Sequence, residues 1–421
     1  MNAFDDRTRL AACVLMMSLI SCACSGSGGS GSDPAVGTPV APPAPAPPPA
    51  PATACDTATG RKLTVGPGKT YPVPSAAAAA AADGDVVLIS AGDFIGDVAT
   101  WPQSNLTICG AGGRARLFAG GNNARGKGIW VVQGANVVID GLEFHNATVP
   151  DQNGAGIRAE GDGLAIRNSG FFDNENGILG PNDGDITIDS SEFARNGRGD
   201  GYTHNIYVGY ANRLVVTNSY FHEAKIGHNL KSRAKETRIE NSYFMDGPTG
   251  TASYEVDVPN GGLVSLRGNL FHKGPRADNA TLVSYGSEGL LGGRTDRLTM
   301  THNTLVSTYP GGAFVYANPG VVLVTLTANL LAGTNNPALF NGDVAGKVVQ
   351  ANNLVSSAAK FSAADNIGIP SFWPSADLVA QALLAAGVVP DAGYVIDAPR
   401  PFVLRSITAR QRVIGALQAP P

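Results

Sequence analysis

The sequence predicts an all-β fold, a single-stranded parallel β-helix of about ten coils with a short N-terminal capping helix. A short apolar pattern recurs along most of the chain, at intervals typical of solenoids. No helical periodicity separates its copies. Gly and Pro contribute 53 and 28 of the 421 residues, which argues against a helical bundle. Since 43% of the residues are hydrophobic, the chain can still bury a core.

The repeat consists of alternating apolar residues, two small or polar residues, and a final Phe or Leu. Clear copies end at Phe144, Phe171, Phe193, Phe221, Phe244 and Phe271, and weaker copies end at Leu305, Leu331 and Val355. Successive copies lie 22 to 34 residues apart. We expect the Phe side chains to stack in the core. We expect the Asn or Ser pair to form a sharp turn, because Asn tolerates a left-handed backbone and bonds to its copies in adjacent coils.

The first residues are typical of a bacterial export signal. Two arginines precede an apolar run over 10–20 that is too short to span a bilayer. The string Leu19-Ile20-Ser21-Cys22 resembles a lipobox. We interpret residues 1–21 as a lipoprotein signal peptide and Cys22 as the lipidated first residue of the mature chain. An ordinary secretory signal is the alternative, and the chain is expected to be exported on either interpretation.

Residues 22–54 are rich in Gly and Ser and then in Pro and Ala, a composition that indicates a linker without a core. The expected location is the outer membrane or cell surface, with the periplasmic side as a second option. Residues 55–421 are expected to form one β-helix domain. Ser75, followed by seven alanines, predicts an N-capped helix that closes the first coil. A C-terminal cap is expected from about residue 372, with a helix within 375–387.

Two cysteines, Cys55 and Cys109, remain in the predicted domain. Because an exported protein reaches an oxidising compartment, we expect them to form a disulfide that ties the start of the domain to its first coils. Two free buried thiols are the alternative.

Each coil carries a second short strand, and its copies align on one inward apolar residue. This alignment places inside the domain Ile129, Ile157, Ile178, Ile206, Leu230, Tyr254, Leu282, Phe314 and Leu339. Equivalent positions in successive coils lie about 4.8 Å apart, so the next residue of each copy belongs to an outward row. Three neighbours in that row are Tyr207, Lys231 and Glu255. Arg233 and Asp257 follow two residues further along their strands.

These polar groups suit the cleavage of an acidic polysaccharide by β-elimination, which needs a cation to neutralise the carboxylate, a base and an acid. We assign Lys231 as the base, Tyr207 or His228 as the acid, and Arg233 as the neutralising cation. The expected substrate-binding residues are Arg158, His204, Asn205, Asn229, Glu255, Asp257 and Tyr285.

Three other interpretations remain open. The charges can form a salt-bridge ladder, in which Lys231 pairs with Glu255 and Arg233 with Asp257. The two carboxylates can serve a glycoside hydrolase, which needs an acid and a second carboxylate beside the bond. The domain can also be a non-catalytic module that binds glycan or holds an envelope assembly together.

Charge and composition restrict the partners. The net charge of −4 argues against general nucleic-acid binding. We expect an acidic polysaccharide as the partner, membrane contact through the lipid anchor alone, and a monomer. The motifs require no cofactor, and calcium is the one ion considered. Its ligands would be Glu255 and Asp257, or aspartates in the Gly/Asn-rich turns, namely Asp151, Asp173, Asp183 and Asp200.

Over roughly residues 60–370 the repeat resembles the right-handed parallel β-helix superfamily of pectate-lyase-like proteins, which implies right-handed coils. The segment GHNLKSRAKETRIENSYF is similar to the Lys-Ser segment of the lyase family that contains chondroitinase B and alginate lyases. That resemblance implies that Lys231 is the base. The family's partner Arg lies one coil later, where this chain reads TASYEVDVPNG and has no Arg. Arg233, Arg158 or a bound calcium ion would have to replace it.

Overall fold

The computed structural model describes residues 53–181, 183–363, 371–381, 393–397, 400–405 and 414–416. The signal peptide expected at 1–21 and nearly all of the linker expected at 22–54 lie outside these residues, so both stay predictions. None of the helices in the described part of the chain has the length and apolarity needed to cross a bilayer.

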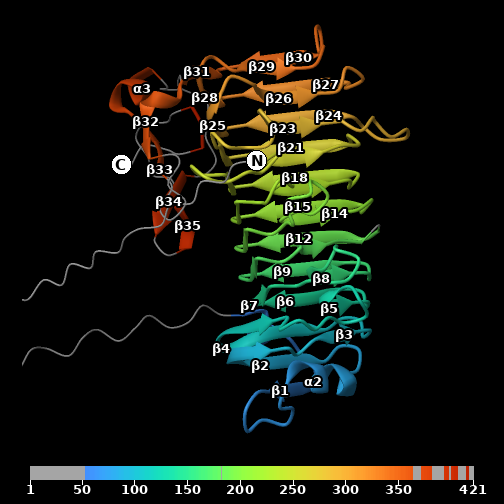
Figure 1. Cartoon of the computed structure of the whole chain (residues 1–421). Helices are drawn as coiled ribbons and strands as arrows, with labels where there is room; N and C mark the ends of the chain where they lie inside the picture. Colours follow the sequence, from blue (N-terminus) through green and yellow to red (C-terminus); the bar gives the residue numbers. More distant parts are fainter. Residues whose placement is uncertain are drawn as a thin grey trace, which may run out of the picture. The chain divides into compact units, whose positions relative to one another are not determined.

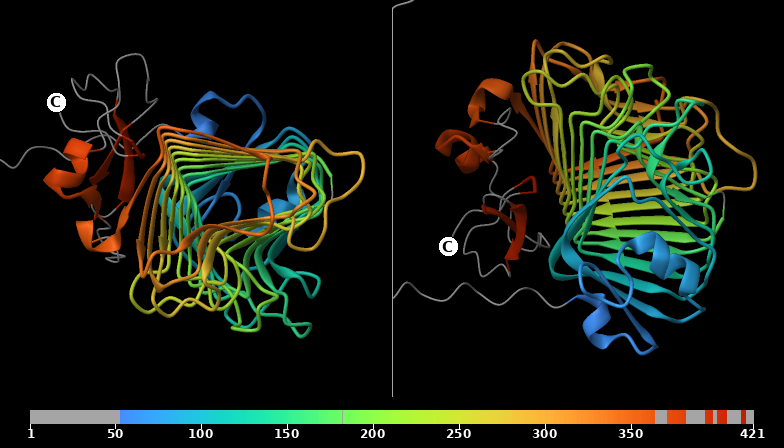
Figure 2. Two further views of the ribbon diagram at one scale, coloured as in Figure 1. Left: turned by 90° about the horizontal axis from the view of Figure 1, so that it is seen from above. Right: turned by 60° about the horizontal axis from the view of Figure 1, so that its bottom comes forward.

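Residues from 62 to 357 wind into a right-handed parallel β-solenoid of about 11 turns, close to the expected ten (Figure 1). Most coils contribute one strand to each of three faces, and each strand pairs in parallel with its equivalent in the next coil. Seen down the stack, the strands superpose in columns and the longer loops project from the corners (Figure 2). The predicted fold class is confirmed.

The three faces are defined by their strands. The first face is a ten-stranded sheet of β3 (Ala99–Trp101), β5 (Gly128–Val132), β8 (Ala155–Ala159), β11 (Asn176–Leu179), β14 (Ile206–Val208), β17 (Leu230–Ser232), β20 (Val256–Val258), β23 (Thr281–Tyr285), β26 (Ala313–Ala317) and β29 (Ala338–Asn341). The second face contains β1 (Lys62–Val65), β2 (Val86–Ile95), β4 (Thr107–Phe118), β6 (Val137–Asp140), β9 (Leu164–Arg167), β12 (Asp185–Asp189), β15 (Arg213–Thr217), β18 (Glu236–Glu240), β21 (Leu263–Arg267), β24 (Arg297–Thr301), β27 (Leu323–Thr327) and β30 (Val348–Ala351). The third face contains β7 (Leu142–His145), β10 (Gly170–Phe172), β13 (Glu192–Ala194), β16 (Tyr220–His222), β19 (Tyr243–Met245), β22 (Leu270–Lys273), β25 (Thr304–Pro310), β28 (Leu330–Thr334) and β31 (Leu354–Ser357), while the long strands β2 and β4 extend from the second face into it.

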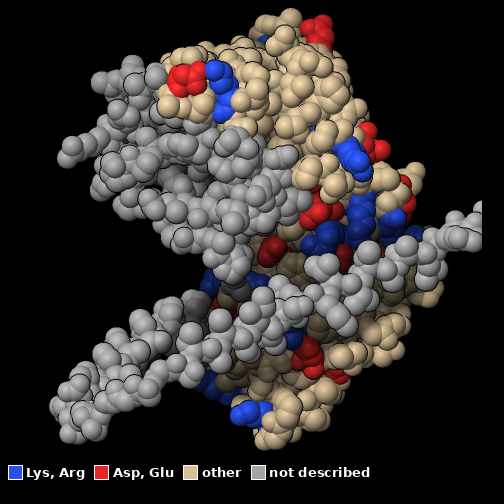
Figure 3. Space-filling view, turned by 60° about the vertical axis from the view of Figure 1, so that its left-hand side comes forward, with Lys and Arg blue, Asp and Glu red and all other residues tan. Residues whose placement is uncertain are grey.

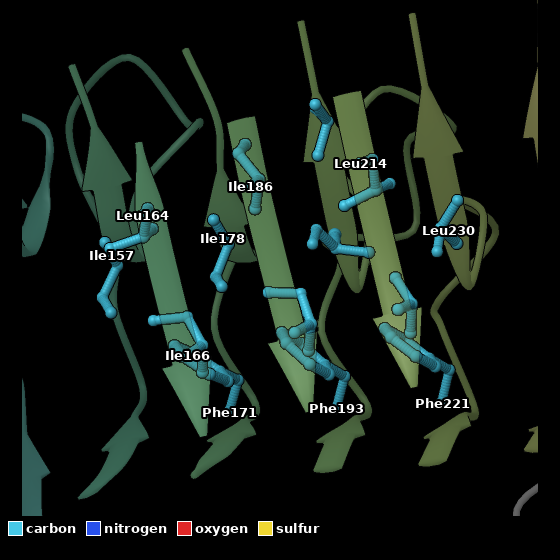
Figure 4. Close-up of a cluster of buried hydrophobic side chains, with 14 of the residues drawn as sticks. Ile157, Leu164, Ile166, Phe171, Ile178, Ile186, Phe193, Leu214, Phe221 and Leu230 are labelled. Carbon is cyan, nitrogen blue, oxygen red and sulfur yellow. The ribbon is translucent and has the colours of Figure 1, made fainter. Parts of the chain in front are cut away.

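The core is built from the inward residues of all three faces, and the expected Phe stack runs through it. The ring centroids of Phe171 and Phe193 lie 4.6 Å apart and those of Phe193 and Phe221 lie 4.7 Å apart, with nearly parallel planes. Figure 4 shows these rings in line beside the aliphatic side chains of neighbouring strands. Burial of one apolar side chain per strand and coil supplies the main favourable term for folding.

The sharp turn between the second and third faces has the conformation expected from the Asn or Ser pair. Its first residue adopts a left-handed backbone, with φ of 45° at Asn168 and 51° at Asn218. Its second residue bonds to its copies: the amide of Asn269 donates to Asn303 at 3.1 Å, and Asn303 donates to Asn329 at 2.9 Å. These bonds satisfy buried polar groups at a corner where the strands end.

The short helices and hairpins lie at the ends of the described chain. Helix α1 spans Ala54–Thr57, and α2 spans Pro74–Ala80 as expected from the alanine run. The expected N-cap at Ser75 is wrong: α2 starts after Val73 with Pro74 at its first position, and the Ser75 hydroxyl instead donates to Asp97 at 2.5 Å. Near the C-terminus, the elements are the turn η1 (Ala358–Lys360), α3 (Ala376–Gln381) and the hairpins β32 (Phe361–Ala363) with β33 (Ser371–Pro374) and β34 (Gly393–Asp397) with β35 (Arg400–Arg405). A capping role for α2 or for residues from 372 stays a prediction.

Outward side chains of the third face are apolar in its later coils. Tyr243 and Leu270 are buried there in a cluster that also holds Phe361 and Leu378. Figure 3 shows Lys and Arg side chains beside Asp and Glu side chains near the middle of the molecule. On the second face, ion pairs between coils include Arg213 in β15 with Asp185 in β12 at 2.6 Å.

Cys55 and Cys109 are joined by the expected disulfide, which links α1 to β4. Replacing both by Ser is expected to lower the free energy of unfolding by about 4 kcal/mol, because the bond closes a loop with a sequence separation of 54 residues. Denaturant titration measures this difference. The reduced parent protein should match the variant, and a variant that unfolds at the parent's midpoint would contradict the expectation.

Candidate functional site

Three of the predicted polar residues lie on adjacent strands of the first face. Tyr207 in β14 pairs in register with Lys231 in β17, and Lys231 pairs with Asp257 in β20. Because side chains alternate along a strand, these three point outward while Ile206 and Leu230 point into the core. We call Tyr207, Lys231 and Asp257 the outward row.

The expected place of Glu255 in this row is wrong. Val256, rather than Tyr254, pairs with Leu230, so the alignment slipped by two residues in this coil. A two-residue slip preserves the alternation of inward and outward positions, and the apolar pattern therefore does not detect it. In four other coils the alignment slipped by one residue, which exchanges the expected inward and outward positions. There Trp130, Val283, Val315 and Phe340 take the register positions expected for Ile129, Leu282, Phe314 and Leu339.

Arg233 lies beside the outward row and is held by several partners. Its Nε donates to the Tyr207 hydroxyl oxygen at 2.8 Å, and its Nη1 donates to Asn260. The guanidinium carbon lies 5.7 Å from the centre of the Tyr207 ring. Lys231 Nζ is 3.5 Å from an Asp257 oxygen. The predicted base, acid and neutralising cation are therefore neighbours.

A residue that the sequence analysis missed completes this group. Glu288 bridges both cations, with one carboxylate oxygen 2.8 Å from Lys231 Nζ and the other 2.5 Å from Arg233 Nη2. Partial burial raises the pKa of Glu288, but the hydrogen bonds from the two cations outweigh it and lower that pKa below its ordinary value. Residues 286–296 connect β23 to β24 and belong to the longest interval of the repeat, between Phe271 and Leu305. The length of that interval was the one sign in the sequence that a long loop lies between these two copies of the repeat.

The 286–296 loop is fixed to the coils beneath it. Asn260 donates its side-chain amide to the Gly289 carbonyl at 3.1 Å. Arg294 donates to the carbonyls of Arg233 at 2.9 Å and Ala234 at 3.2 Å. The loop therefore reaches back across two strands of the first face and holds Glu288 against the cations.

The two predicted histidines stack at the start of the strands, beneath the outward row. The rings of His204 and His228 lie 4.7 Å apart at an angle of 10°. The backbone N–H of His228 donates to His204 Nδ1 at 3.0 Å, and that of Tyr254 donates to His228 Nδ1 at 3.3 Å. Both Nδ1 atoms are acceptors, so each neutral ring carries its proton on Nε2. His228 Nε2 lies 3.5 Å from Asp257.

Burial keeps both imidazoles neutral. It lowers the pKa of His204 to about 3, with the Lys231 charge as a further cause, and it lowers that of His228 well below the ordinary value. His228 is 8% exposed. These properties favour Tyr207 over His228 as the acid, since a buried neutral imidazole is a poor proton donor to a polymer outside.

We expect the ring nitrogens of His204 and His228 to keep their neutral chemical shifts in a nitrogen-15 titration from pH 7 to pH 5. Because both pKa values are lowered in the folded state, these two side chains bind more protons in the unfolded chain below about pH 6.5, and their contribution to stability should fall as the pH falls from there. Thermal unfolding over the same range tests the sign. Imidazolium signals from both stacked rings at pH 6 would contradict the expectation.

Asn205, Asn229 and Glu255 belong to a buried polar chain and are fully shielded from solvent. Asn205 donates to Asn229, and Asn229 donates to Glu255, both at 2.6 Å. Lys273 Nζ lies 3.0 Å from Glu255 and 3.5 Å from Asp246, and these three charged residues have no exposed side-chain surface. Contact of Asn205, Asn229 or Glu255 with a substrate outside the solenoid is excluded in this structure. Burial and the Asp246 charge raise the pKa of Glu255.

Two other predicted binding residues lie apart from the outward row. Arg158 is on the same line of side chains but is separated from Tyr207 by Leu179, so it lies two strands away. Tyr285 is buried in the core, and its hydroxyl donates to the Gly262 carbonyl at 2.7 Å. Its expected contact with substrate is therefore wrong for this structure.

Glu255 and Asp257, considered together as calcium ligands, do not come together. Glu255 is inside the solenoid on Lys273, whereas Asp257 faces outward toward Lys231 and His228. Within the described ranges, no group of three or more His, Cys, Asp or Glu side chains is arranged to hold a metal ion. The residues at this site do not fit the calcium ion that we considered.

The comparisons with known proteins concern the fold. Residues 121–244 match the family described as right handed beta helix region. Pectate lyase Pel9A superposes with a TM-score of 0.57 at 16% identity, covering 87% of this chain and 98% of that one. ORF18 of Geobacillus virus E2 gives 0.36 at 14% identity, covering 68% and 54%. DFA-IIIase from Arthrobacter chlorophenolicus A6 gives 0.38 at 13% identity, covering 67% and 86%. No curated protein sequence matches significantly. The described coils, the family match over residues 121–244 and the likeness to Pel9A together show that the chain has a right-handed parallel β-helix fold.

Proposed function

We propose that the chain is an exported polysaccharide lyase that cleaves a uronic-acid polymer by β-elimination at the outward row. The observation that carries the proposal is the pair of cations, Lys231 and Arg233, which already bind one carboxylate beside the Tyr207 hydroxyl. The likeness to Pel9A agrees with the proposal at the level of the fold.

The reaction assigns one step to each side chain. Arg233 neutralises the uronate carboxylate, which makes the proton on the adjacent ring carbon more acidic. Lys231 acts as the base in its amine form, after its ammonium group has lost a proton to solvent. It takes the ring proton, and the released electron pair forms a carbon–carbon double bond as the bond to the glycosidic oxygen breaks. Tyr207 donates its proton to the leaving oxygen. Because the Tyr207 oxygen accepts a hydrogen bond from Arg233 Nε, its own proton is free to point toward the substrate.

A panel of uronic-acid polysaccharides tests the function. Each polymer is incubated with the protein, and ultraviolet absorbance of the unsaturated product is followed. Absorbance with at least one polymer is the expected result. New reducing ends without absorbance would favour a hydrolase, and tight binding without either product would favour the non-catalytic module.

The hydrolase alternative loses one of its two carboxylates in this fold. Glu255 is buried on Lys273, while Asp257 faces outward, so the two do not flank a common groove. A hydrolase would need another partner for Asp257.

We further propose that the protein is exported and anchored by lipid on Cys22, on the basis of Leu19-Ile20-Ser21 before it. Mass spectrometry of protein from its native membrane is expected to show an N-terminal peptide that begins at diacylated Cys22. A Cys22→Ala variant should remain unprocessed or lose its membrane association. An unmodified N-terminus at another residue would contradict the proposal.

A further inference from the structure

Glu288 has the position that a bound acidic ligand would take. Its carboxylate is shared between Lys231 and Arg233, whose side chains are only 11% and 12% exposed. The Glu288 side chain itself is 45% exposed and reaches the cations from the solvent side. An exposed carboxylate therefore covers two largely buried cations.

We infer that Lys231 and Arg233 form a carboxylate-binding subsite, and that Glu288 occupies it in the free protein in place of the uronate carboxylate of the substrate. The inference rests on the proposed function. A uronate presents the same planar, two-oxygen anion as Glu288, and a guanidinium beside an ammonium group binds such an anion through two charge-assisted hydrogen bonds.

The contacts of the loop allow the side chain to leave while the backbone stays. The backbone N–H of Glu288 donates to the Pro259 carbonyl at 3.0 Å, and the neighbouring Gly289 is held by Asn260. Arg294 fixes the far end of the loop. Release of Glu288 then requires rotation about its own side-chain bonds, and an ion pair with a half-exposed partner is worth little free energy.

This arrangement makes Glu288 a specificity-determining residue. A neutral sugar that displaced it would leave the poorly solvated Arg233 without this counter-charge and Lys231 with Asp257 alone, which is costly. An acidic sugar replaces the lost carboxylate with its own. The subsite therefore selects uronates over neutral or esterified sugars. Glu288 lowers the affinity for uronates, because its carboxylate competes with theirs for the same cations.

Calorimetric titration with trigalacturonate and trimannuronate, each also in its methyl-esterified form, tests the inference. Glu288→Gln is expected to bind at least one acidic trimer about tenfold more tightly than the parent, and neither ester more tightly. Glu236→Gln, on the second face, is the matched control and should change nothing. Adding Arg233→Gln to Glu288→Gln should remove the gain.

The outcomes separate this inference from the proposed lyase activity. Equal affinity of the parent and Glu288→Gln for both acidic trimers, or no measurable binding to either protein, overturns the subsite. A similar gain for the esters also overturns it. A gain for an acidic trimer supports the subsite even if no polymer yields unsaturated product, a result that would count against the lyase alone.

Discussion

A Lys231→Ala variant is expected to lose elimination activity by about 10²–10⁴-fold, the contribution typical of a general base. Lys231 projects outward from β17 between Tyr207 and Asp257, and its Nζ is the amine closest to the proposed carboxylate position. The initial rate of absorbance increase on a confirmed substrate measures the loss. Binding of an acidic trimer should weaken as well, since the same ammonium group contributes to the subsite.

Lys235→Ala is the control for that experiment. Lys235 lies four residues later in the same segment, and its ammonium group donates to Asn212 at 2.7 Å, away from Glu288. The control should keep the parent rate and the parent unfolding temperature, and Lys231→Ala should still fold, because neither side chain packs in the core. Parent-level turnover by Lys231→Ala would refute its assignment and favour a charge ladder on this face.

Lys273→Met is expected to have the largest effect on stability, a loss of about 3–5 kcal/mol in the free energy of unfolding. Lys273 is fully buried between Glu255 and Asp246, and it also donates to the carbonyls of Ala252 and Ser253. Its removal leaves two carboxylates in the interior without a cation. Denaturant titration, or the yield of folded protein where the variant does not accumulate, measures the result.

Neutralising one carboxylate should restore part of that loss. The double variant Lys273→Met with Glu255→Gln keeps one buried acid that can protonate, and it should be more stable than Lys273→Met alone. Lys225→Met removes a half-exposed lysine and should cost well under 1 kcal/mol. A Lys273→Met protein as stable as the parent would show that the buried charges contribute nothing.

The repeat predicted the fold well because a solenoid applies the same local rules in every coil. The Phe stack and the left-handed turn at Asn168 and Asn218 follow from residue types that recur at one position. The pairing of Tyr207 with Lys231 was predictable for the same reason. Each of the two residues directly follows the same three-residue pattern of His, Asn and an apolar residue. Features that recur at the same position in every coil were therefore predictable from the sequence.

Residues outside the repeat were not predictable in this way. Glu255 follows the alternation of an outward residue, yet it lies before its strand and takes the place of Asn229 in the buried chain. Glu288 reaches Lys231 over 57 residues of sequence through a loop whose path no periodicity specifies. Lys273 was missed because a charged side chain is expected at the surface, and its buried partners lie on two other segments.

The hydrogen bonds of the buried amide chain all run from an earlier donor to a later acceptor. This order limits where an additional coil can be inserted into the solenoid. Asn196 donates to Asn205, Asn205 to Asn229, and Asn229 to Glu255, so every amide passes its bond toward the later coils. Between Asn205 and Asn229 the same residue repeats in the same role, and a duplicated coil inserted there would find a matching donor and acceptor. After Glu255 the amide series ends on a carboxylate that depends on Lys273. A coil duplicated at that point would separate Glu255 from Lys273. We therefore expect an inserted coil to be tolerated before Glu255 and to destabilise the fold after it.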